Sequence, residues 1–261
     1  RTLLDEMDAL QCIVVWDPEG SVSADREITF ADFSARGAKH QAKVPDCVAI
    51  AEAALKAEDA ALIVYTSGTT GRPKGVPLTH ANVLASLAAG EPLMDPMQPD
   101  DITLSFLPMA HVGEHVPGFF GRMNIGLATA YATNYDTVLD ELLEIRPTYF
   151  GAVPRIFEKM YGRIHEEVAK ANPRRQAIFR WAKDLACRRT RAEQGGDPLS
   201  LKDRLLLPVA DKLIYRRIRA VFGGRVKGFI TGSAPIHIDI LEFFFGIGMR
   251  IIELYGLSEA T

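Results

Sequence analysis

Short apolar runs alternate along the chain with stretches of helical periodicity. Apolar runs of this kind, bounded by Gly, Pro, Asp or Asn, are typical of buried strands, whereas apolar positions at i, i+3, i+4 and i+7 predict helices. Strands are expected at residues 12–17, 59–65, 101–108, 127–132, 148–154, 225–231 and 249–255. Because helical patterns separate several of these strands, we predict an α/β fold with a largely parallel β-sheet flanked by helices.

The helical patterns differ in how clearly they begin and end. Residues 28–37 form a short helical pattern that ends at a glycine, and residues 38–58 are typical of a linker with a short helix. A helix is expected from Thr79 or His80 to about Gly90, because THANVLASLAAG begins with capping residues and continues with an apolar face. Further helical patterns cover residues 136–145, 155–171, 174–193 and 201–222. The glycine-rich stretch before Thr79 is thereby expected to join a strand directly to a helix.

Charge is distributed unevenly along the sequence. Residues 155–219 hold 17 of the 30 basic residues and 8 of the 33 acidic ones, so their net charge is +9 (17 − 8), while the remainder carries −12 (13 − 25). We define residues 155–222 as the basic helical segment, within one larger domain. Two interpretations stay open: solvated basic faces of surface helices, or a surface that meets anionic lipid or an anionic substrate.

Composition limits the class of protein. The chain has 261 residues, 48% of them hydrophobic, so it can bury a sizeable core, and its net charge of −3 gives no overall case for nucleic acid as a partner. Cys12, Cys47 and Cys187 are widely spaced, so neither a disulfide framework nor a zinc ribbon is expected, and a cytoplasmic setting fits best. No apolar run reaches the length of a membrane span, and no signal-peptide layout opens the chain. Contact with a membrane would therefore be peripheral.

The stretch YTSGTTGRPKG, from Tyr65 to Gly75, concentrates hydroxyl groups, glycines and a lysine directly after an apolar run. A Walker A loop needs GxxxxGK[ST], but here Gly68 and Gly71 are three apart and Pro73 precedes the lysine. The glycines still let backbone N–H groups approach an anion, while the hydroxyls and the lysine add donors and a positive charge. We interpret the stretch as a polyphosphate clamp of a different design; a mobile polar linker is the alternative.

Extended to YTSGTTGRPKGVPLTHANV, this stretch resembles the phosphate loop of the adenylate-forming superfamily, which includes acyl-CoA synthetases, luciferases and nonribosomal peptide adenylation domains. Two further blocks agree in order and approximate spacing: TGSAPI at 231–236 is similar to the adenine-side loop, and LYGLSEAT at 254–261 to the aromatic-Gly-hydroxyl-Glu motif. LSFLPMAHVGEH and YFGAVPRIFEKMYGRI resemble the long-chain fatty acid–CoA ligases. The resemblance covers nearly the whole chain and implies part of the large N-terminal AMP-binding domain of such an enzyme.

The resemblance implies residues that bind ATP. The β and γ phosphates would be bound by six loop residues, Thr66, Ser67, Gly68, Thr69, Thr70 and Gly71, with Lys74 nearby. Tyr255, followed by Gly256, would stack on the adenine, opposite a wall formed by Gly232, Ser233, Ala234 and Pro235.

The resemblance also implies residues that serve the reaction itself. Ser258 would bond a phosphate oxygen, and Glu259 would hold Mg²⁺, a hard cation that prefers oxygen ligands. His111 would lie near the reacting carboxylate, so His111 and Glu259 are the implied catalytic residues.

The implied reaction has two steps. A long-chain fatty acid is first joined to the α-phosphate of ATP with release of pyrophosphate, and the thiol of coenzyme A then displaces AMP. The chain begins at Arg1 and ends at Thr261, before the family's ribose-binding aspartate, hinge and C-terminal lid domain. We therefore interpret the 261 residues as a piece of a longer protein that binds nucleotide and acyl group with little turnover.

Alternatives from other classes stay open. A fatty acyl-AMP ligase or an amino-acid adenylation domain would share the phosphate loop but load a carrier protein, and a non-catalytic module would bind nucleotide without acyl preference. His111 to His115 also match HxxEH of zinc peptidases, which requires one helix to present both histidines. Gly113 and Pro117 disfavour such a helix.

Overall fold

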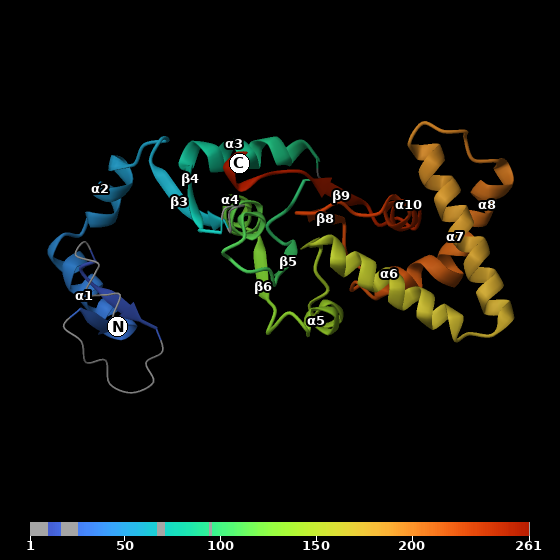
Figure 1. The fold of residues 1–261 in the computed structure, drawn as a ribbon, viewed down its shortest axis with the longest axis horizontal. Helices are drawn as coiled ribbons and strands as arrows, with labels where there is room; N and C mark the ends of the chain where they lie inside the picture. Colours follow the sequence, from blue (N-terminus) through green and yellow to red (C-terminus); the bar gives the residue numbers. More distant parts are fainter. Residues whose placement is uncertain (1–9, 17–25, 67–70, 94–95, 261) are drawn as a thin grey trace. The chain divides into compact units, whose positions relative to one another are not determined.

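The computed structural model describes residues 10–16, 26–66, 71–93 and 96–260 (Figure 1). The chain divides into two compact units, Arg1–Ala57 and Glu58–Thr261. In the first unit, two short parallel strands, β1 (Ile13–Val15) and β2 (Glu27–Thr29), are followed by two helices, α1 (Phe30–Lys43) and α2 (Cys47–Ala54).

Helix α1 is longer than the sequence pattern predicts. It begins after Thr29, whose Oγ1 accepts a hydrogen bond from the Asp32 N–H, and it continues past Gly37 to Lys43. The prediction of a helix over 28–37 that ends at the glycine was wrong. An exposed glycine lowers helix stability by only about 1 kcal/mol, so one such residue does not end a helix whose other positions favour it.

The second unit opens with an antiparallel hairpin that carries the glycine-rich loop. Strand β3 (Ala60–Thr66) pairs with β4 (Lys74–Thr79), and α3 (His80–Gly90) begins only after β4. Thr79 caps this helix, because its Oγ1 accepts from the Asn82 N–H (3.1 Å) and Asn82 Oδ1 accepts from the Thr79 N–H (3.0 Å). The helix prediction is confirmed. The loop, however, joins two strands, and the prediction that it leads directly to the helix was wrong because Gly and Pro conceal the strand KGVPLT.

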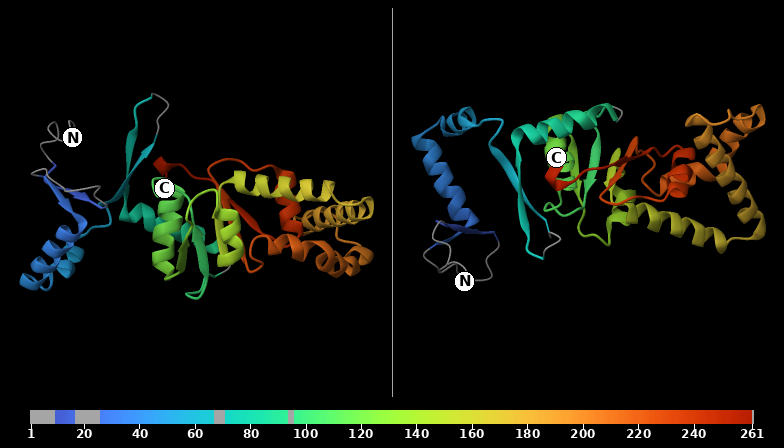
Figure 2. Two further views of the ribbon diagram at one scale, coloured as in Figure 1. Left: turned by 90° about the horizontal axis from the view of Figure 1, so that it is seen from below. Right: turned by 45° about the horizontal axis from the view of Figure 1, so that its top comes forward.

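The main sheet has five parallel strands in the order β6-β5-β7-β8-β9 (Figures 1 and 2). Its strands are β5 (Ile102–Ser105), β6 (Ala128–Tyr131), β7 (Tyr149–Ala152), β8 (Gly228–Gly232) and β9 (Ile251–Leu254). The crossovers contain the π-helix η3 (Glu114–Phe120), α4 (Gly121–Ile125), α5 (Val138–Ile145) and α10 (Ile238–Gly246). The predicted α/β class with a parallel sheet is confirmed, although most predicted runs extend a few residues beyond the strands.

The basic helical segment lies between β7 and β8. It consists of α6 (Pro154–Ala169), α7 (Pro173–Glu193), α8 (Leu201–Ala210), the π-helix η4 (Asp211–Tyr215) and α9 (Arg216–Ala220). The helix predicted over 201–222 is thus helical but changes from α to π and back. Pro208 lies inside α8, where it lacks an N–H donor and crowds the preceding turn, which favours a wider turn nearby.

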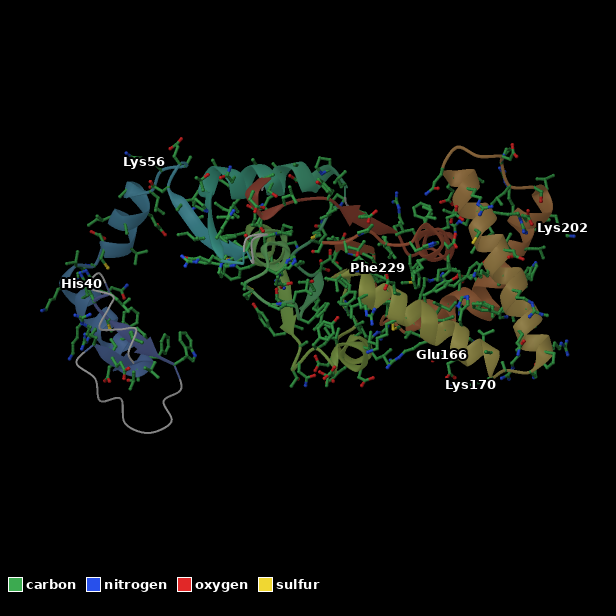
Figure 3. All side chains as sticks on the ribbon, in the orientation of Figure 1. His40, Lys56, Glu166, Lys170, Lys202 and Phe229 are labelled. Carbon is green, nitrogen blue, oxygen red and sulfur yellow. The ribbon has the colours of Figure 1, made fainter. Side chains whose placement is uncertain are left out.

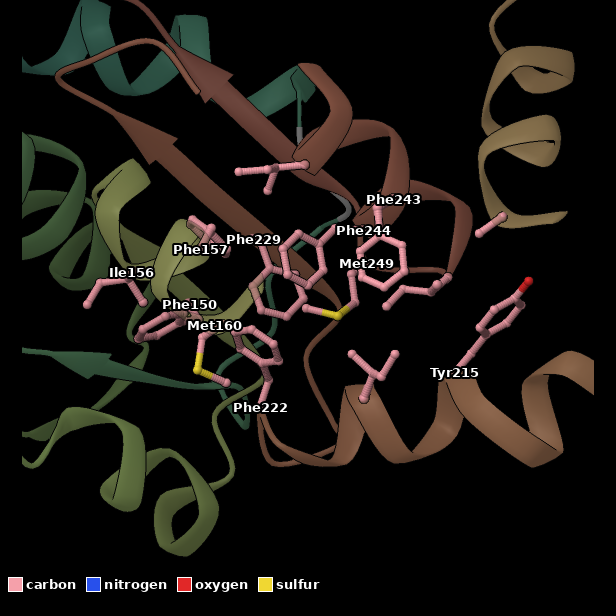
Figure 4. Packing of buried hydrophobic residues seen from close by; sticks show 14 of the residues in the cluster. Phe150, Ile156, Phe157, Met160, Tyr215, Phe222, Phe229, Phe243, Phe244 and Met249 are labelled. Carbon is pink, nitrogen blue, oxygen red and sulfur yellow. The ribbon is translucent and has the colours of Figure 1, made fainter. Parts of the chain in front are cut away.

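Aromatic side chains fill the core between the sheet and these helices (Figure 4). The Phe157 ring lies 6.0 Å from that of Phe229 and 6.3 Å from that of Phe244, and Phe222 lies 5.3 Å from Phe229, mostly in edge-to-face geometry. Full burial of each such side chain stabilises the fold by about 1.5–3 kcal/mol. The core therefore anchors the bodies of β7 and β8.

An ion pair between a half-exposed lysine and a buried aspartate lies at the amino-terminal edge of the sheet. Lys227 Nζ lies 2.7 Å from Asp101 Oδ1, just before β8 and β5 respectively. Burial alone would raise the pKa of Asp101, but the hydrogen bonds from Lys227, the Gln98 N–H and Thr148 outweigh it and hold this pKa below its ordinary value. The Lys227–Asp101 pair therefore stabilises the fold at this edge.

Two findings bear on the surroundings of the protein. Cys12, Cys47 and Cys187 are free thiols in the structure. Among the described helices, none combines the length and apolar character that a membrane span requires.

Candidate functional site

The sequence-predicted site residues follow the carboxyl ends of neighbouring parallel strands. Strands β5, β7, β8 and β9 are adjacent in the sheet, so their carboxyl ends lie along one edge. His111 follows β5, residues 233–236 follow β8, and residues 255–259 follow β9. Open parallel sheets bind ligands at this edge, so the topology brings three separate motifs to a suitable place.

A hydrogen bond joins the histidine to the turn after β8. His111 Nε2 lies 3.1 Å from Ser233 Oγ, across 122 positions of sequence. The Gly113 N–H donates to His111 Nδ1 at 3.0 Å, so in the neutral ring the proton lies on Nε2 and is donated to the serine hydroxyl. A side chain at Gly113 would meet the imidazole ring at 3.1 Å. The local backbone therefore fixes the orientation of His111.

The turn after β8 is strained and closely packed. Ser233 has φ +72°, a left-handed conformation that non-glycine residues rarely adopt outside functional sites and turns. Gly232 is paired with Leu254 on β9, and a Cβ at Gly232 would lie 2.9 Å from the Leu254 carbonyl oxygen. Only glycine allows this approach. The turn consequently projects Ser233, Ala234 and Pro235 to the surface at the sheet edge.

The segment after β9 lies beside this turn. Tyr255 directly follows β9 and is 92% exposed, which leaves its ring free to stack on a planar ligand. Glu253 Oε1 accepts a hydrogen bond from the Ile236 N–H at 3.2 Å and ties the two segments together. The structure thus brings Tyr255 and the predicted adenine-side wall to adjacent strands.

The glycine-rich loop extends from the β3–β4 hairpin. Ser67, Gly68, Thr69 and Thr70 lie outside the described residues. Thr66 and Lys74 form the pair of the hairpin that flanks the loop, Gly71 has φ +84°, and Lys74 is exposed. Within the described residues, Lys74 has no ion-pair partner, so its ammonium group is available to an anionic ligand.

A small apolar cluster places the hairpin next to the His111 segment. Val64 and Leu78 from the hairpin pack with Val83 of α3 and Val116 of π-helix η3, and all four are buried. Because η3 begins three residues after His111, the hairpin is held against the same segment that positions this histidine. No hydrogen bond among the described residues joins the loop flanks directly to the sheet edge.

The last motif residues form a short exposed turn. Ser258–Ala260 is one 3₁₀ turn, and Gly256, before it, has open space around its Cα. Glu259 is exposed, with no ion-pair partner within the described range. The described residues contain no group of three His, Cys, Asp or Glu that could hold a metal. A single free carboxylate nevertheless suits Mg²⁺, which is commonly held by one or two carboxylates together with substrate phosphates.

A buried polar network under His111 was missed by the sequence analysis. Ser105 Oγ, at the end of β5, donates to Glu114 Oε1 at 2.6 Å, and Glu114 is also ion-paired with Arg122. Arg122 donates in addition to the Gly118 carbonyl of π-helix η3. The side chains of Glu114 and Arg122 are both only 9% exposed. The lone arginine in the apolar stretch FFGRMNIG, eight residues after the glutamate, is the signal that could have revealed this pair.

The same network bears on the resemblance of HVGEH to the zinc-peptidase pattern. Glu114, which a zinc peptidase would use as its base, is occupied by Arg122 and Ser105. His115 Nδ1 lies 3.0 Å from the Met109 carbonyl oxygen, and His111 Nδ1 accepts from Gly113. The glutamate and both histidines of the pattern are therefore engaged in local structure.

The fold is an α/β domain, and the predicted site residues gather at the carboxyl ends of its parallel strands. The family model described as AMP-binding enzyme matches residues 4–261. The chain belongs to this family.

Curated relatives include fatty acid–CoA ligases. The chain is 35% identical over 216 residues to "Long-chain-fatty-acid--CoA ligase FadD15" of Mycobacterium bovis, covering 80% of this chain and 34% of that protein. It is 33% identical over 214 residues to "Long-chain-fatty-acid--CoA ligase ACSBG2" of Rattus norvegicus, covering 79% of this chain and 32% of that protein. The chain thus spans about a third of the length of the curated relatives that it matches.

Solved structures support the fold. ATP-bound MatB of Rhodopseudomonas palustris matches with TM-score 0.50 and 22% identity over 78% of this chain and 30% of that chain. The A-PCP didomain of carboxylic acid reductase from Segniliparus rugosus, in complex with AMP, matches with TM-score 0.51 and 25% identity over 77% of this chain and 24% of that chain.

Proposed function

We propose that the full-length protein activates a long-chain fatty acid with ATP and transfers the acyl group to coenzyme A. The family membership and the named activities of the curated relatives support this reaction. The observation that carries the proposal is the His111–Ser233 hydrogen bond, because it joins the histidine motif to the adenine-side turn at the ligand edge of the sheet.

In the proposed first step, a carboxylate oxygen of the fatty acid attacks the α-phosphorus of ATP. The new P–O bond forms as the bond to the β-phosphate oxygen breaks, and pyrophosphate leaves with its electron pair. Lys74 and the loop from Thr66 to Gly71 bind the β and γ phosphates, which offsets the charge on the leaving group. His111, held in place by its hydrogen bond to Ser233, lies near the reacting carboxylate and helps to align it.

The proposed nucleotide site uses the two segments beside the β8–β9 edge. Tyr255 stacks on the adenine opposite the turn from Gly232 to Pro235, with Gly256 leaving room for the ligand. Ser258 bonds a phosphate oxygen. Glu259 is the residue that would hold Mg²⁺, which supplies charge neutralisation of the phosphates when bound.

In the proposed second step, the thiolate of coenzyme A attacks the acyl carbonyl carbon. The C–S bond forms, the C–O bond to AMP breaks, and AMP leaves with the electron pair. The fatty acid tail requires an apolar surface, and an apolar concavity of about 290 Å³ lies between α3 and the η3–α4 region, lined mainly by Val83, Leu84, Leu87, Phe120 and Met123. Each buried methylene of a tail adds about 0.8 kcal/mol, so affinity should rise with chain length.

Calorimetry with non-hydrolysable acyl-adenylate mimics tests the substrate class. Acetyl, medium-chain, long-chain and aminoacyl mimics are titrated into the protein, and affinity is expected to rise with alkyl length. Equal affinity for all four mimics would contradict a lipid substrate while leaving adenylate binding in place.

Exchange of labelled pyrophosphate into ATP tests the residue roles in the full-length protein. Lys74→Met and His111→Ala should each lower the fatty-acid-dependent exchange rate by about 10²-fold, the effect of removing one group that stabilises charge. Arg72→Met, another exposed cation of the same hairpin, serves as the control and should change the rate little. Equal losses in Arg72→Met and Lys74→Met would contradict a specific role for Lys74.

A carrier protein is the second candidate acceptor. The structural match to a didomain that includes a carrier protein is the observation that favours it. Acyl transfer that proceeds without coenzyme A, to the phosphopantetheine arm of a carrier protein, would establish this alternative.

The proposal extends to the 261 residues by themselves. Because they span about a third of the relatives' length, we expect them to bind nucleotide and acyl group but to turn over slowly. A cytoplasmic setting is part of the proposal, and the three free thiols support it. Multi-turnover acyl-CoA synthesis by this chain alone would contradict the expectation of slow turnover.

A further inference from the structure

An exposed apolar stripe runs along α8 and π-helix η4. Leu201, Leu205, Val209 and Leu213 follow one another at intervals of four residues and are 78%, 77%, 45% and 41% exposed. Aliphatic side chains of this size occur singly on most surfaces, whereas a continuous row of them marks an interaction site. We define these four residues as the α8 stripe.

The change from α to π geometry keeps the stripe on one face. In an α-helix, a step of four residues rotates about 40° beyond a full turn, so a long row would drift around the helix. A π-helix has more residues per turn, and the turn Asp211–Tyr215 rotates Leu213 back toward the row.

The opposite face of the same helices is anchored. Ala210, Tyr215 and Ile218 are buried, and Tyr215 Oη donates to the Ala182 carbonyl of α7 at 2.7 Å. The stripe is consequently held outward by a fixed helix.

Unpaired basic residues flank the stripe. Residues 201–220 contain six basic and two acidic residues, a net charge of +4 (6 − 2). Both acidic groups are occupied, since Asp203 pairs with Arg188 (2.9 Å) and Asp211 with Arg219 (2.6 Å). Five exposed cations have no ion-pair partner within the described part of the chain: Lys202, Arg204, Lys212, Arg216 and Arg217. Figure 3 labels Lys202, the first of these five residues along the chain.

We propose that the α8 stripe and its five flanking cations form a docking surface for an anionic lipid bilayer. An interfacial helix buries its aliphatic face at the boundary between headgroups and acyl chains, while lysine and arginine at its borders contact anionic headgroups. Nucleic acid explains the charges but gives four aliphatic side chains no partner, because it is bound through phosphate contacts and aromatic stacking. A bilayer satisfies both features of the surface at once.

Vesicle flotation of the full-length protein tests this proposal. Vesicles are made of phosphatidylcholine alone or with about a third phosphatidylserine, and no ATP, fatty acid or coenzyme A is added, so the result is independent of the proposed ligase activity. The protein should float with the anionic vesicles. Leu201→Gln/Leu205→Gln and Lys212→Glu/Arg216→Glu should each lower the partition coefficient at least about tenfold.

Two matched controls separate the stripe from general charge or hydrophobicity. Arg174→Glu/Arg175→Glu makes the same change in net charge on exposed residues near the start of α7, and Leu143→Gln removes an exposed leucine on α5. In Figure 3, Lys170, just before α7, lies far from Lys202. Both controls should bind anionic vesicles within about twofold of the unmodified protein, a difference of about 0.4 kcal/mol.

Hydrogen exchange of the unmodified protein gives a second measurement that needs no substitution. Amides of residues 201–217 should gain protection on anionic vesicles, whereas residues 174–180 should not. The proposal is overturned if the unmodified protein does not bind anionic vesicles, or if the α7 charge control loses as much binding as the α8 variants. It is also overturned if the Gln variants keep full binding but unfold at lower temperature, since another part of the protein then covers the stripe.

Discussion

Strand β8 has two ends with opposite properties. Phe229, in its body, is 2% exposed and contacts Phe157 and Phe222, whereas Ser233, one residue after its end, is exposed in a left-handed conformation (Figure 3 labels Phe229). The first region is an aromatic core in which side chains fill the available volume. The second is an open edge with a strained turn, an exposed tyrosine and a carboxylate without an ion-pair partner among the described residues.

The comparison indicates that stability and function are separated along each strand. Residues in the core satisfy local preference and packing together, as stable folds require. Ser233 adopts a backbone conformation that serine disfavours. In folded proteins, such strained residues cluster at functional sites. Substitutions in the core should therefore change the free energy of unfolding, and substitutions at the edge should change ligand binding.

The largest stability effect is expected for Phe229→Ala. Removing a fully buried ring leaves a cavity among Phe157, Phe222 and the sheet, so the free energy of unfolding should fall by about 3–5 kcal/mol. Urea denaturation measures the change. Phe33→Ala, which removes a half-exposed ring in α1, is the control and should change stability by less than about 1 kcal/mol. Equal losses would mean that the core is not the main source of stability.

Arg122→Ala tests the network beneath the edge. It leaves the Glu114 carboxylate buried without its charge partner, so stability should fall by about 3 kcal/mol. Arg188→Ala breaks the ion pair with Asp203, which involves a half-exposed arginine, and should lower stability by at most about 1 kcal/mol. A small effect of Arg122→Ala would contradict the expectation that this ion pair is isolated from water.

Gly246→Ala tests the packing of α10 on α7. A Cβ at this position would lie 2.1 Å from the Ala186 carbonyl oxygen, so the helices must separate and stability should fall by about 2 kcal/mol. Gly162→Ala is the matched control, because Gly162 lies inside α6 with open space around it, and alanine there should stabilise by about 0.5–1 kcal/mol. Thermal unfolding of both variants would show opposite shifts, and shifts of the same sign would contradict the close helix approach.

Ser233→Gly should act in opposite directions on stability and on the site. Glycine adopts φ +72° without strain, so the free energy of unfolding should rise by about 1 kcal/mol. The hydrogen bond to His111 is lost, and adenylate binding should weaken. Ser233→Ala keeps the strain and loses the bond, so it should weaken binding without the gain in stability. If Ser233→Gly left the free energy of unfolding unchanged, the left-handed backbone at Ser233 would not be strained.

The smallest effect concerns pH and His165, a partly buried histidine of α6. Burial, followed by the nearby Lys183 ammonium, lowers the pKa of His165 below its ordinary value. Between the two pKa values, the unfolded chain binds a proton at this histidine more readily than the folded chain does. The free energy of unfolding is therefore highest above the ordinary histidine pKa of about 6.5 and falls as pH drops toward the lowered pKa. Urea denaturation between neutral and mildly acidic pH should show this slope. His165→Phe should flatten it, and an unchanged slope would assign the pH dependence to other groups.

The sequence predicted most of the local structure. Apolar runs and helical periodicity located the five strands of the main sheet and helices α3, α5, α6 and α7, because these signals depend on neighbouring residues only. It was wrong where a local signal misleads: Gly37 does not end α1, and Gly75 and Pro77 conceal β4. The roles of the motif residues stay predictions, and four of the loop residues lie outside the described range.

The sequence by itself determined the fold class, the basic helical segment and the family motifs, since composition, periodicity and ordered motifs are properties of the chain. Tertiary structure alone decided three things: the bond between His111 and Ser233, the burial of Glu114 with Arg122, and the outward orientation of the α8 stripe. Each depends on residues that are distant in sequence or on which helix face is covered. Such relations arise when strands and helices pack, and hydrophobic periodicity carries no information about the partner.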